Sequence, residues 1–131
     1  MNMEQRREKI VSLINREGSV SFTKLKENFH QVSEMTLRRD LAMINFHTAF
    51  IGVTGYIHSR GFTCGSPEEC ELKRTVIEHS EKAVMLMDSQ KIGVTSMCTF
   101  ARAEDVSAVV SDGGLDEKTL REFERAGAEV L

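Results

Sequence analysis

Residues 33–41 read Ser33-Glu34-Met35-Thr36-Leu37-Arg38-Arg39-Asp40-Leu41 and carry the strongest pattern in the chain. Leu37 and Leu41 are four residues apart, which is the spacing of one buried helix face. Ser33 precedes this run and is a good helix N-cap, because its hydroxyl can accept a hydrogen bond from a backbone N–H group of the first turn. The pattern predicts an amphipathic helix. Its outward-facing residues would be Thr36, Arg38 and Arg39.

Two further helices are predicted before this one. The first spans roughly Glu4–Glu17 and ends at Gly18, because glycine readily adopts the left-handed conformation that closes a helix. Ser21 is a suitable N-cap for the second helix, which would bury Leu25. Residues 1–45 are therefore expected to form a three-helix, helix-turn-helix DNA-binding domain.

In that architecture the third helix lies in the major groove of DNA. Thr36 and Arg38 are close to its N-terminus, where base edges come within reach. Arg39 and Lys24 would neutralise phosphates, which adds affinity without sequence choice. The pattern alone leaves open a second interpretation, in which the three helices serve contacts with another protein.

After residue 45 the chain changes to short apolar runs separated by helices. Buried strands are expected at residues 49–53, 83–87 and 106–111, with a fourth strand starting at 128. Ser66-Pro67 and Asp116 would open the two intervening helices, and the glycine-rich segment 55–65 is interpreted as a loop. Strands that alternate with helices predict an α/β domain with a partial parallel sheet in residues 46–131.

Polar residues follow two of these strands. Asp88, Ser89 and Lys91 come directly after the second strand, and Asp112 ends the third. Ligands of parallel sheets bind at the carboxyl ends of the strands, and a lysine there can pair with a phosphate. The alternative is that Asp88 and Asp112 only cap the strand ends.

The stretch from Ser33 to Leu41 also resembles the recognition helix of the DeoR family of bacterial repressors. The family pattern is S-x-x-T-[apolar]-R-[R/K]-D-L, and every position matches. The resemblance implies a DNA-binding transcriptional regulator in which Ser33 caps the helix and Thr36, Arg38 and Arg39 contact DNA. One difference lies in the turn before this helix, where many members have a glycine and this chain has His30-Gln31.

Four segments after residue 49 resemble the C-terminal portion of the DeoR sensor domain. That domain is similar in fold to ribose-5-phosphate isomerases and binds phosphorylated sugars or sugar alcohols. The resemblance assigns Gly55, Thr63, Asp88, Ser89 and Lys91 to the effector pocket. The segments are Phe50-Ile51-Gly52-Val53-x-Gly55, Gly61-Phe62-Thr63, Glu69-x-Glu71-Leu72-Lys73 and Asp88-Ser89-x-Lys91-x-Gly93.

Compared with that family, the chain looks internally deleted between Ile44 and Ala49. The β-wing, the interdomain linker and the first half of the sensor are missing there. We therefore expect a phosphorylated sugar to bind weakly, leaving DNA binding largely unregulated by it. Two alternatives remain: a sugar-phosphate-binding or isomerase-like remnant with Asp88 and Lys91 as acid and base, or a dimerising module that binds no DNA.

The overall composition limits these alternatives. The net charge is −3, but residues 1–45 carry eight Lys or Arg against six Asp or Glu, which makes them mildly basic. We expect a cytoplasmic regulator that is not an enzyme and has no membrane contact, cofactor or metal. Cys64, Cys70 and Cys98 suggest no disulfide framework. A homo-oligomer is expected because a partial sheet exposes its edges and helix-turn-helix proteins pair across a DNA dyad.

Overall fold

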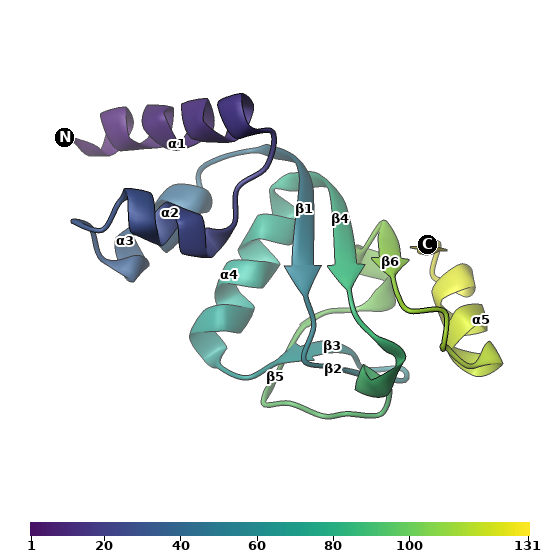
Figure 1. Ribbon diagram of the computed structural model, residues 1–131. Coiled ribbons are helices and arrows are strands. Elements are labelled where there is room, and N and C mark those ends of the chain that lie inside the picture. Colours follow the sequence, from purple (N-terminus) through teal and green to yellow (C-terminus); the bar gives the residue numbers. More distant parts are fainter. The chain divides into compact units, whose positions relative to one another are not determined.

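The computed structural model describes all 131 residues. They form two compact units, Met1–Asn45 and Phe46–Leu131, and each is described by itself (Figure 1). Among the helices of both units, none combines the length and the apolar character needed to cross a bilayer.

The first unit consists of three helices, α1 (Met3–Glu17), α2 (Phe22–Asn28) and α3 (Glu34–Leu41). Ser21 and Ser33 cap α2 and α3, since each side chain accepts a hydrogen bond from a backbone N–H group in the first turn. Gly18 ends α1 with a φ of 84°. The caps predicted at these three positions are confirmed. The apolar core contains Ile10, Leu13, Leu25, Phe29, Leu37, Leu41 and Ile44.

The turn between α2 and α3 closes without a glycine. No residue between Asn28 and Ser33 has a positive φ, so the backbone there requires no glycine. A hydrogen bond from the Val32 N–H to the Phe29 carbonyl, 3.1 Å long, holds the turn. His30-Gln31 is therefore compatible with a regular turn. After α3 the chain enters the first strand within a few residues, and no β-hairpin follows the helix.

The second unit is built on a four-stranded sheet in which every neighbouring pair is parallel, as the sequence predicts. Its strands are β1 (Phe46–Gly52), β4 (Ser80–Leu86), β6 (Ala108–Val110) and β7 (Glu129–Val130), arranged in that order. Helix α4 (Pro67–Glu78) precedes β4, and α5 (Glu117–Arg125) precedes β7. Ser66 and Asp116 cap the two helices.

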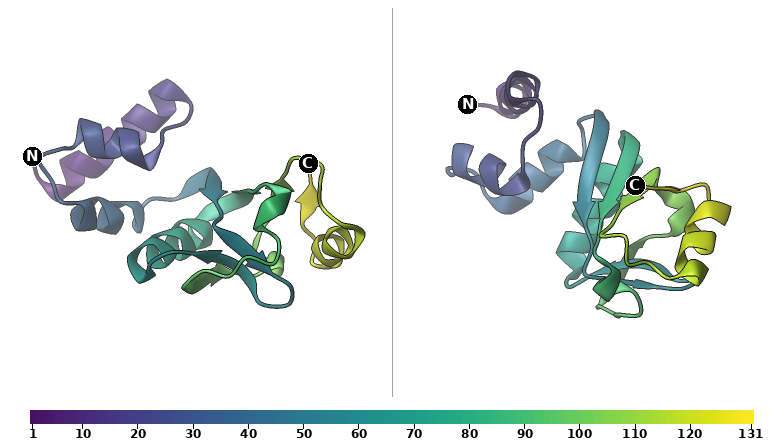
Figure 2. Two further views of the ribbon diagram at one scale, coloured as in Figure 1. Left: turned by 60° about the horizontal axis from the view of Figure 1, so that its bottom comes forward. Right: turned by 45° about the vertical axis from the view of Figure 1, so that its right-hand side comes forward.

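A second, antiparallel sheet replaces the loop expected at residues 55–65. It consists of β2 (Gly55–Ile57), β3 (Gly61–Cys64) and β5 (Cys98–Ala101), with β3 in the middle. Ser59 and Gly61, with φ of 64° and 120°, form the tight turn between β2 and β3. Figures 1 and 2 show this small sheet beyond the carboxyl ends of β1 and β4.

One apolar core joins the two sheets and the two helices of this unit. Ile51, Met85 and Val109 from the large sheet pack with Phe62 from the small sheet and Phe123 from α5. The Phe62 and Phe123 rings are stacked with their centroids 5.9 Å apart. Leu120 of α5 lies outside this core, and its side chain is 38% exposed.

The expectation for the cysteines is also wrong. Cys64 at the end of β3 is bonded to Cys70 in the first turn of α4, with Cα atoms 6.1 Å apart. Cys98 stands opposite Cys64 across the β3–β5 pair and has a free thiol. The odd number and uneven spacing of the cysteines gave no sign of this arrangement, because it depends on the small sheet.

Candidate nucleic-acid interface and effector site

The outward face of α3 carries the polar residues expected from the sequence. Thr36 lies in the first turn, where its hydroxyl is 2.9 Å from the Ser33 hydroxyl and its N–H donates to that oxygen. Arg38 is half-buried, and Arg39, one position further, is exposed. The helix thus presents a hydroxyl and two guanidinium groups within two turns of its N-terminus.

The Arg38 guanidinium is partly fixed within its own helix. Its Nη2 donates to Glu34 Oε1 over 2.8 Å, an i,i+4 ion pair on the helix surface. Its Nε is buried and has no hydrogen-bond partner in the chain. Arg39 makes one weak contact, from Nη2 to the Met35 sulfur at 3.6 Å. Nη1 of Arg38 and Nη1 of Arg39 make no hydrogen bond within the chain, so each side chain keeps a donor for another molecule.

Asp40 does not face outward with its neighbours. Its side chain is 1% exposed, and its carboxylate accepts hydrogen bonds from Arg6 and Arg7 of α1. The bond from Arg7 Nε to Asp40 Oδ1 is 3.1 Å. This double ion pair ties α3 to α1. Sequence reasoning missed it, although Asp40 belongs to the DeoR recognition-helix pattern.

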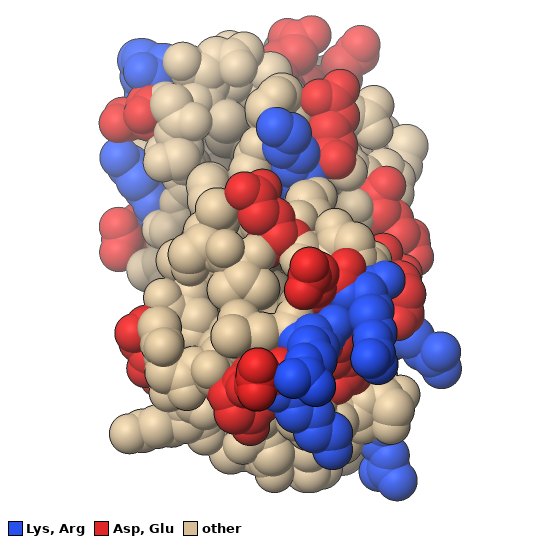
Figure 3. Space-filling model, turned by 90° about the vertical axis from the view of Figure 1, so that its right-hand side faces the viewer, with Lys and Arg blue, Asp and Glu red and all other residues tan.

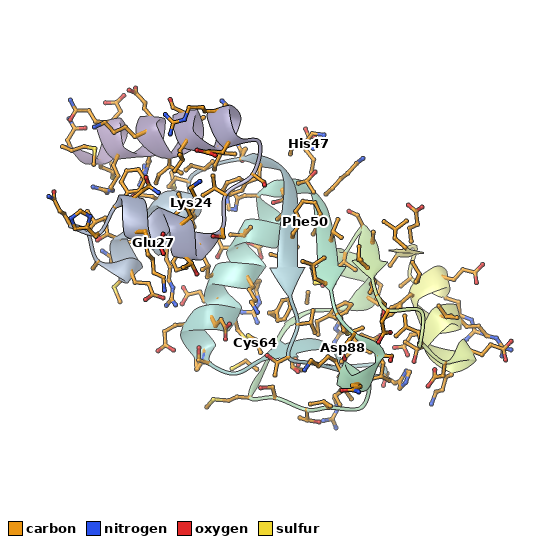
Figure 4. All side chains as sticks on the ribbon, viewed as in Figure 1. Lys24, Glu27, His47, Phe50, Cys64 and Asp88 are labelled. Atoms are coloured by element: carbon orange, nitrogen blue, oxygen red, sulfur yellow. A yellow bond between two sulfur atoms is a disulfide. The ribbon has the colours of Figure 1, made fainter.

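Lys24 lies on α2 and not on α3 (labelled in Figure 4). Its ammonium group is 3.4 Å from Glu17 Oε2, and both side chains are largely exposed, so the pair is weak and solvated.

The predicted effector residues at the end of β4 lie in a short 3-10 turn. Asp88 (labelled in Figure 4) caps this turn by accepting from the Gln90 N–H over 2.9 Å, and Ser89 and Lys91 belong to it. Lys91 is half-buried and makes no ion pair within the chain. The turn therefore offers one free ammonium group beside the ends of the parallel strands.

Asp112 closes this turn from the end of β6. It accepts hydrogen bonds from the Ser89 N–H over 3.2 Å and from the Ser89 hydroxyl over 3.1 Å. The Gly114 N–H donates to it over 3.0 Å. These backbone N–H groups, first Gly114 and then Ser89, lower the pKa of the Asp112 carboxyl. The two strand ends are thus brought together, and both carboxylates bind backbone N–H groups of the protein.

Gly55 and Thr63, the other two predicted effector residues, lie inside the small sheet. Both are buried, and the Thr63 hydroxyl donates to the Gly55 carbonyl over 3.0 Å. A Cβ atom at Gly55 would come within 2.0 Å of the Val94 carbonyl oxygen. These two residues pack β2 against the segment after the 3-10 turn, and they present no polar atom to the surface.

Lys73 was missed as a candidate. Its ammonium group donates to the Gly52 carbonyl at the end of β1 over 2.7 Å and lies 5.2 Å from the Phe100 ring centroid. It therefore stands at the same edge of the large sheet as the turn that holds Asp88. The only signal in the sequence was its place within a segment that resembles the sensor domain.

A polar cluster joins the small sheet to α5. Glu122 accepts from the Tyr56 hydroxyl over 2.7 Å, from the Ser59 N–H over 2.8 Å and from the His58 ring. Burial acts to raise the pKa of Glu122, but these three hydrogen bonds outweigh it and lower the pKa. Burial and the bond to Glu122 raise the pKa of Tyr56. We call this set the hairpin–α5 latch.

The α5 side of the second unit carries both signs of charge. Lys and Arg side chains lie among Asp and Glu side chains there (Figure 3). A surface of mixed charge gives no continuous track for a phosphate backbone. This face therefore offers no second candidate for DNA contact.

Comparisons with known proteins agree with the resemblance to the DeoR family. A family model described as the DeoR C-terminal sensor domain matches residues 21–113. The HTH-type transcriptional regulator GlpR of Haloferax volcanii is 31% identical over 87 residues, which are 66% of this chain and 34% of GlpR. GolR of Listeria innocua, of the same type, is 30% identical over 88 residues, 66% of this chain and 35% of GolR.

A third relative carries the word repressor in its name. The HTH-type transcriptional repressor GlcR of Bacillus subtilis is 28% identical over 91 residues, which are 70% of this chain and 35% of GlcR. The chain spans about a third of the length of the curated relatives it matches.

Proposed function

Because the chain belongs to the DeoR family of transcriptional regulators, we propose that its first unit binds operator DNA through α3. Thr36 and Arg38 read base edges in the major groove, while Arg39 and Lys24 contact phosphates. Ser33 holds the start of the helix at the groove. The proposal makes the chain a repressor of genes for sugar or sugar-alcohol metabolism, and it includes no enzymatic activity.

The observation that carries this proposal is the division of α3 into two faces. Leu37, Leu41 and Asp40 hold one face against the rest of the unit, Asp40 through the arginines of α1. On the opposite face, the Nη1 groups of Arg38 and Arg39 make no hydrogen bond within the chain. A helix that is fixed on one side and presents arginines on the other is suited to groove binding.

For the effector, we propose that Asp88, Ser89 and Lys91 contact a phosphorylated sugar weakly. Lys91 supports this as the one unpaired cation of the turn, while Asp112 already occupies the Ser89 donors. Gly55 and Thr63 would act indirectly, because Gly55 packs against Val94, which follows the turn that holds Lys91, and Thr63 donates a hydrogen bond to Gly55. The proposal includes an impaired response, because the first half of the sensor, which would supply groups opposite Lys91, is missing between Ile44 and Ala49.

The test is selection from a pool of random-sequence DNA duplexes by the full chain, followed by sequencing of the bound fraction. The proposal expects enrichment of a defined motif, and two inverted copies of it if the chain binds as a dimer. The matched control is the double variant Arg38→Ala/Arg39→Ala, which should enrich nothing. If the unaltered chain enriches no motif from the pool, the proposal that it recognises DNA is wrong.

The alternative of a sugar-phosphate-binding or isomerase-like remnant has less support. It requires Asp88 and Lys91 to act as acid and base, but Asp88 is exposed and caps its own turn. The other alternative, a dimerising module that binds no DNA, would leave the arginine face of α3 without a role.

A further inference from the structure

One face of the large sheet is uncovered, and the topology explains why. The chain passes from β1 to β4, β6 and β7 in steps that all lead in one direction across the sheet. Connections between parallel strands are right-handed, so steps in one direction place every connection on the same face. Helices α4 and α5 and the small sheet therefore all pack on one side.

The burial of alternate residues agrees with this argument. Ile51, Met85 and Val109 point into the core. Their neighbours along the three strands, Phe50, Leu86 and Val110, are outside that core and are 61%, 43% and 37% exposed. Phe50 (labelled in Figure 4) is in register with Val84, and Leu86 with Val110. We call this surface the open face. Its exposed residues are Phe50, Leu86 and Val110, and Val84 and Ala108 on the same side of the strands are 9% and 6% exposed.

An open face of this kind requires an explanation. Parallel sheets are covered on both faces in nearly all folded proteins. A contiguous exposed apolar patch with a polar border marks an interaction surface. The open face has aromatic and aliphatic side chains on three adjacent strands, so it has the composition of an interface core.

The charges on the border of the open face indicate its partner. Lys82 lies two residues before Val84 on β4 and so points to the same face, and Glu129 of β7 is in register with Ala108. Both side chains are exposed, and neither makes an ion pair within the chain. They have opposite signs and stand on different strands. The border is therefore complementary to itself.

We propose that two copies of this chain pair through their open faces in a two-fold dimer. The apolar residues of one copy cover those of the other, and Lys82 of each copy lies beside Glu129 of its partner. A two-fold axis makes both ion pairs at once, which a self-complementary surface requires. The face of the sheet, not its edge, is thus the site of association.

Sedimentation equilibrium of the full chain over a range of concentrations tests the proposal. The dimer should dominate at micromolar concentration. Leu86→Glu, at the centre of the open face, should give a monomer. The control is Leu120→Glu, which places the same charge on the exposed side of α5 and should leave the dimer unchanged. The proposal is overturned if the unaltered chain stays monomeric. It is also overturned if the Leu86→Glu variant still forms the dimer.

Charge reversal gives an independent test that does not depend on how the core tolerates a buried charge. Lys82→Glu or Glu129→Lys should each raise the dimer dissociation constant about fivefold or more, because each breaks two pairs and creates two repulsions. An equimolar mixture of the two single variants should recover the original affinity, since every contact is then between opposite charges. A mixture no tighter than the separate variants rules out this pairing.

Discussion

At the scale of single residues, Asp40 supports the outward face of α3 although its own side chain points away from that face. It is buried, and its two arginine partners come from α1, more than thirty residues earlier in the chain. Its neighbours Arg38 and Arg39 are thereby held on the opposite face of α3. The Asp in the recognition-helix pattern is thus explained by packing, and the arginines belong to the face proposed to bind DNA.

Replacing Asp40 with Ala should destabilise the first unit by about 3–5 kcal/mol, because it leaves the buried Arg6 without a counter-ion. Hydrogen–deuterium exchange followed by mass spectrometry should show loss of protection in α1 and α3. The matched control is Glu27→Ala, an exposed acid on α2 that makes no ion pair. Undiminished protection in the Asp40 variant would contradict this role.

At the scale of elements, the hairpin–α5 latch joins the β2–β3 turn to a helix about sixty residues later in the chain. Glu122 has a lowered pKa in the folded chain. A lowered pKa means that the latch contributes its full stability above the ordinary carboxyl range, near pH 4.3, and loses it as the pH falls further. Tyr56 is the one tyrosine of the chain and there is no tryptophan, so its fluorescence reports on this cluster.

Glu122→Gln should therefore lower the free energy of unfolding by about 1–3 kcal/mol at pH 7. The difference from the unaltered chain should shrink as the pH falls below about 4.3. Urea unfolding monitored by Tyr56 fluorescence measures both values. Glu124→Gln, on the exposed side of the same helix, is the control and should change neither. A difference that stays constant down to pH 3 would show that the Glu122 charge is not the cause.

The turn that holds Lys91 leads to another prediction at this scale. Each missing charge-assisted hydrogen bond lowers binding by about 1.5–3 kcal/mol. Calorimetric titration with a panel of sugar phosphates should therefore show weak binding or none, and Lys118→Ala on α5 should behave like the unaltered chain. Micromolar binding that Lys91→Ala abolishes would mean that the remaining half-site is sufficient.

The elements also show how far the sequence can predict this structure. The helices of the first unit and the parallel strands follow from apolar spacing and from caps at Ser21, Ser33 and Asp116, which are local signals. The small sheet was missed because its strands are three or four residues long and its central strand β3 pairs with β5, more than thirty residues away. The Asp40 ion pairs and the burial of Gly55 against Val94 depend on such long-range packing.

At the scale of the whole molecule, the chain combines a three-helix unit with a sheet that is covered on one face. The first unit carries the arginines proposed to bind DNA, and the second carries the surface proposed to pair two copies. Pairing would supply two recognition helices, which is how helix-turn-helix proteins gain specificity. Neither proposal needs a working effector pocket.

The central claim is that α3 recognises DNA, and equilibrium titration of a labelled duplex carrying the selected motif tests it most directly. Arg38→Ala should lose about 1–3 kcal/mol on that duplex and nothing on a scrambled one. Arg39→Ala should weaken both duplexes alike and reduce the slope of log affinity against log salt by about one. Arg60→Ala, an exposed arginine of the second unit, is the control for loss of charge. If both α3 variants bind the motif as tightly as the unaltered chain, α3 is not the reading element.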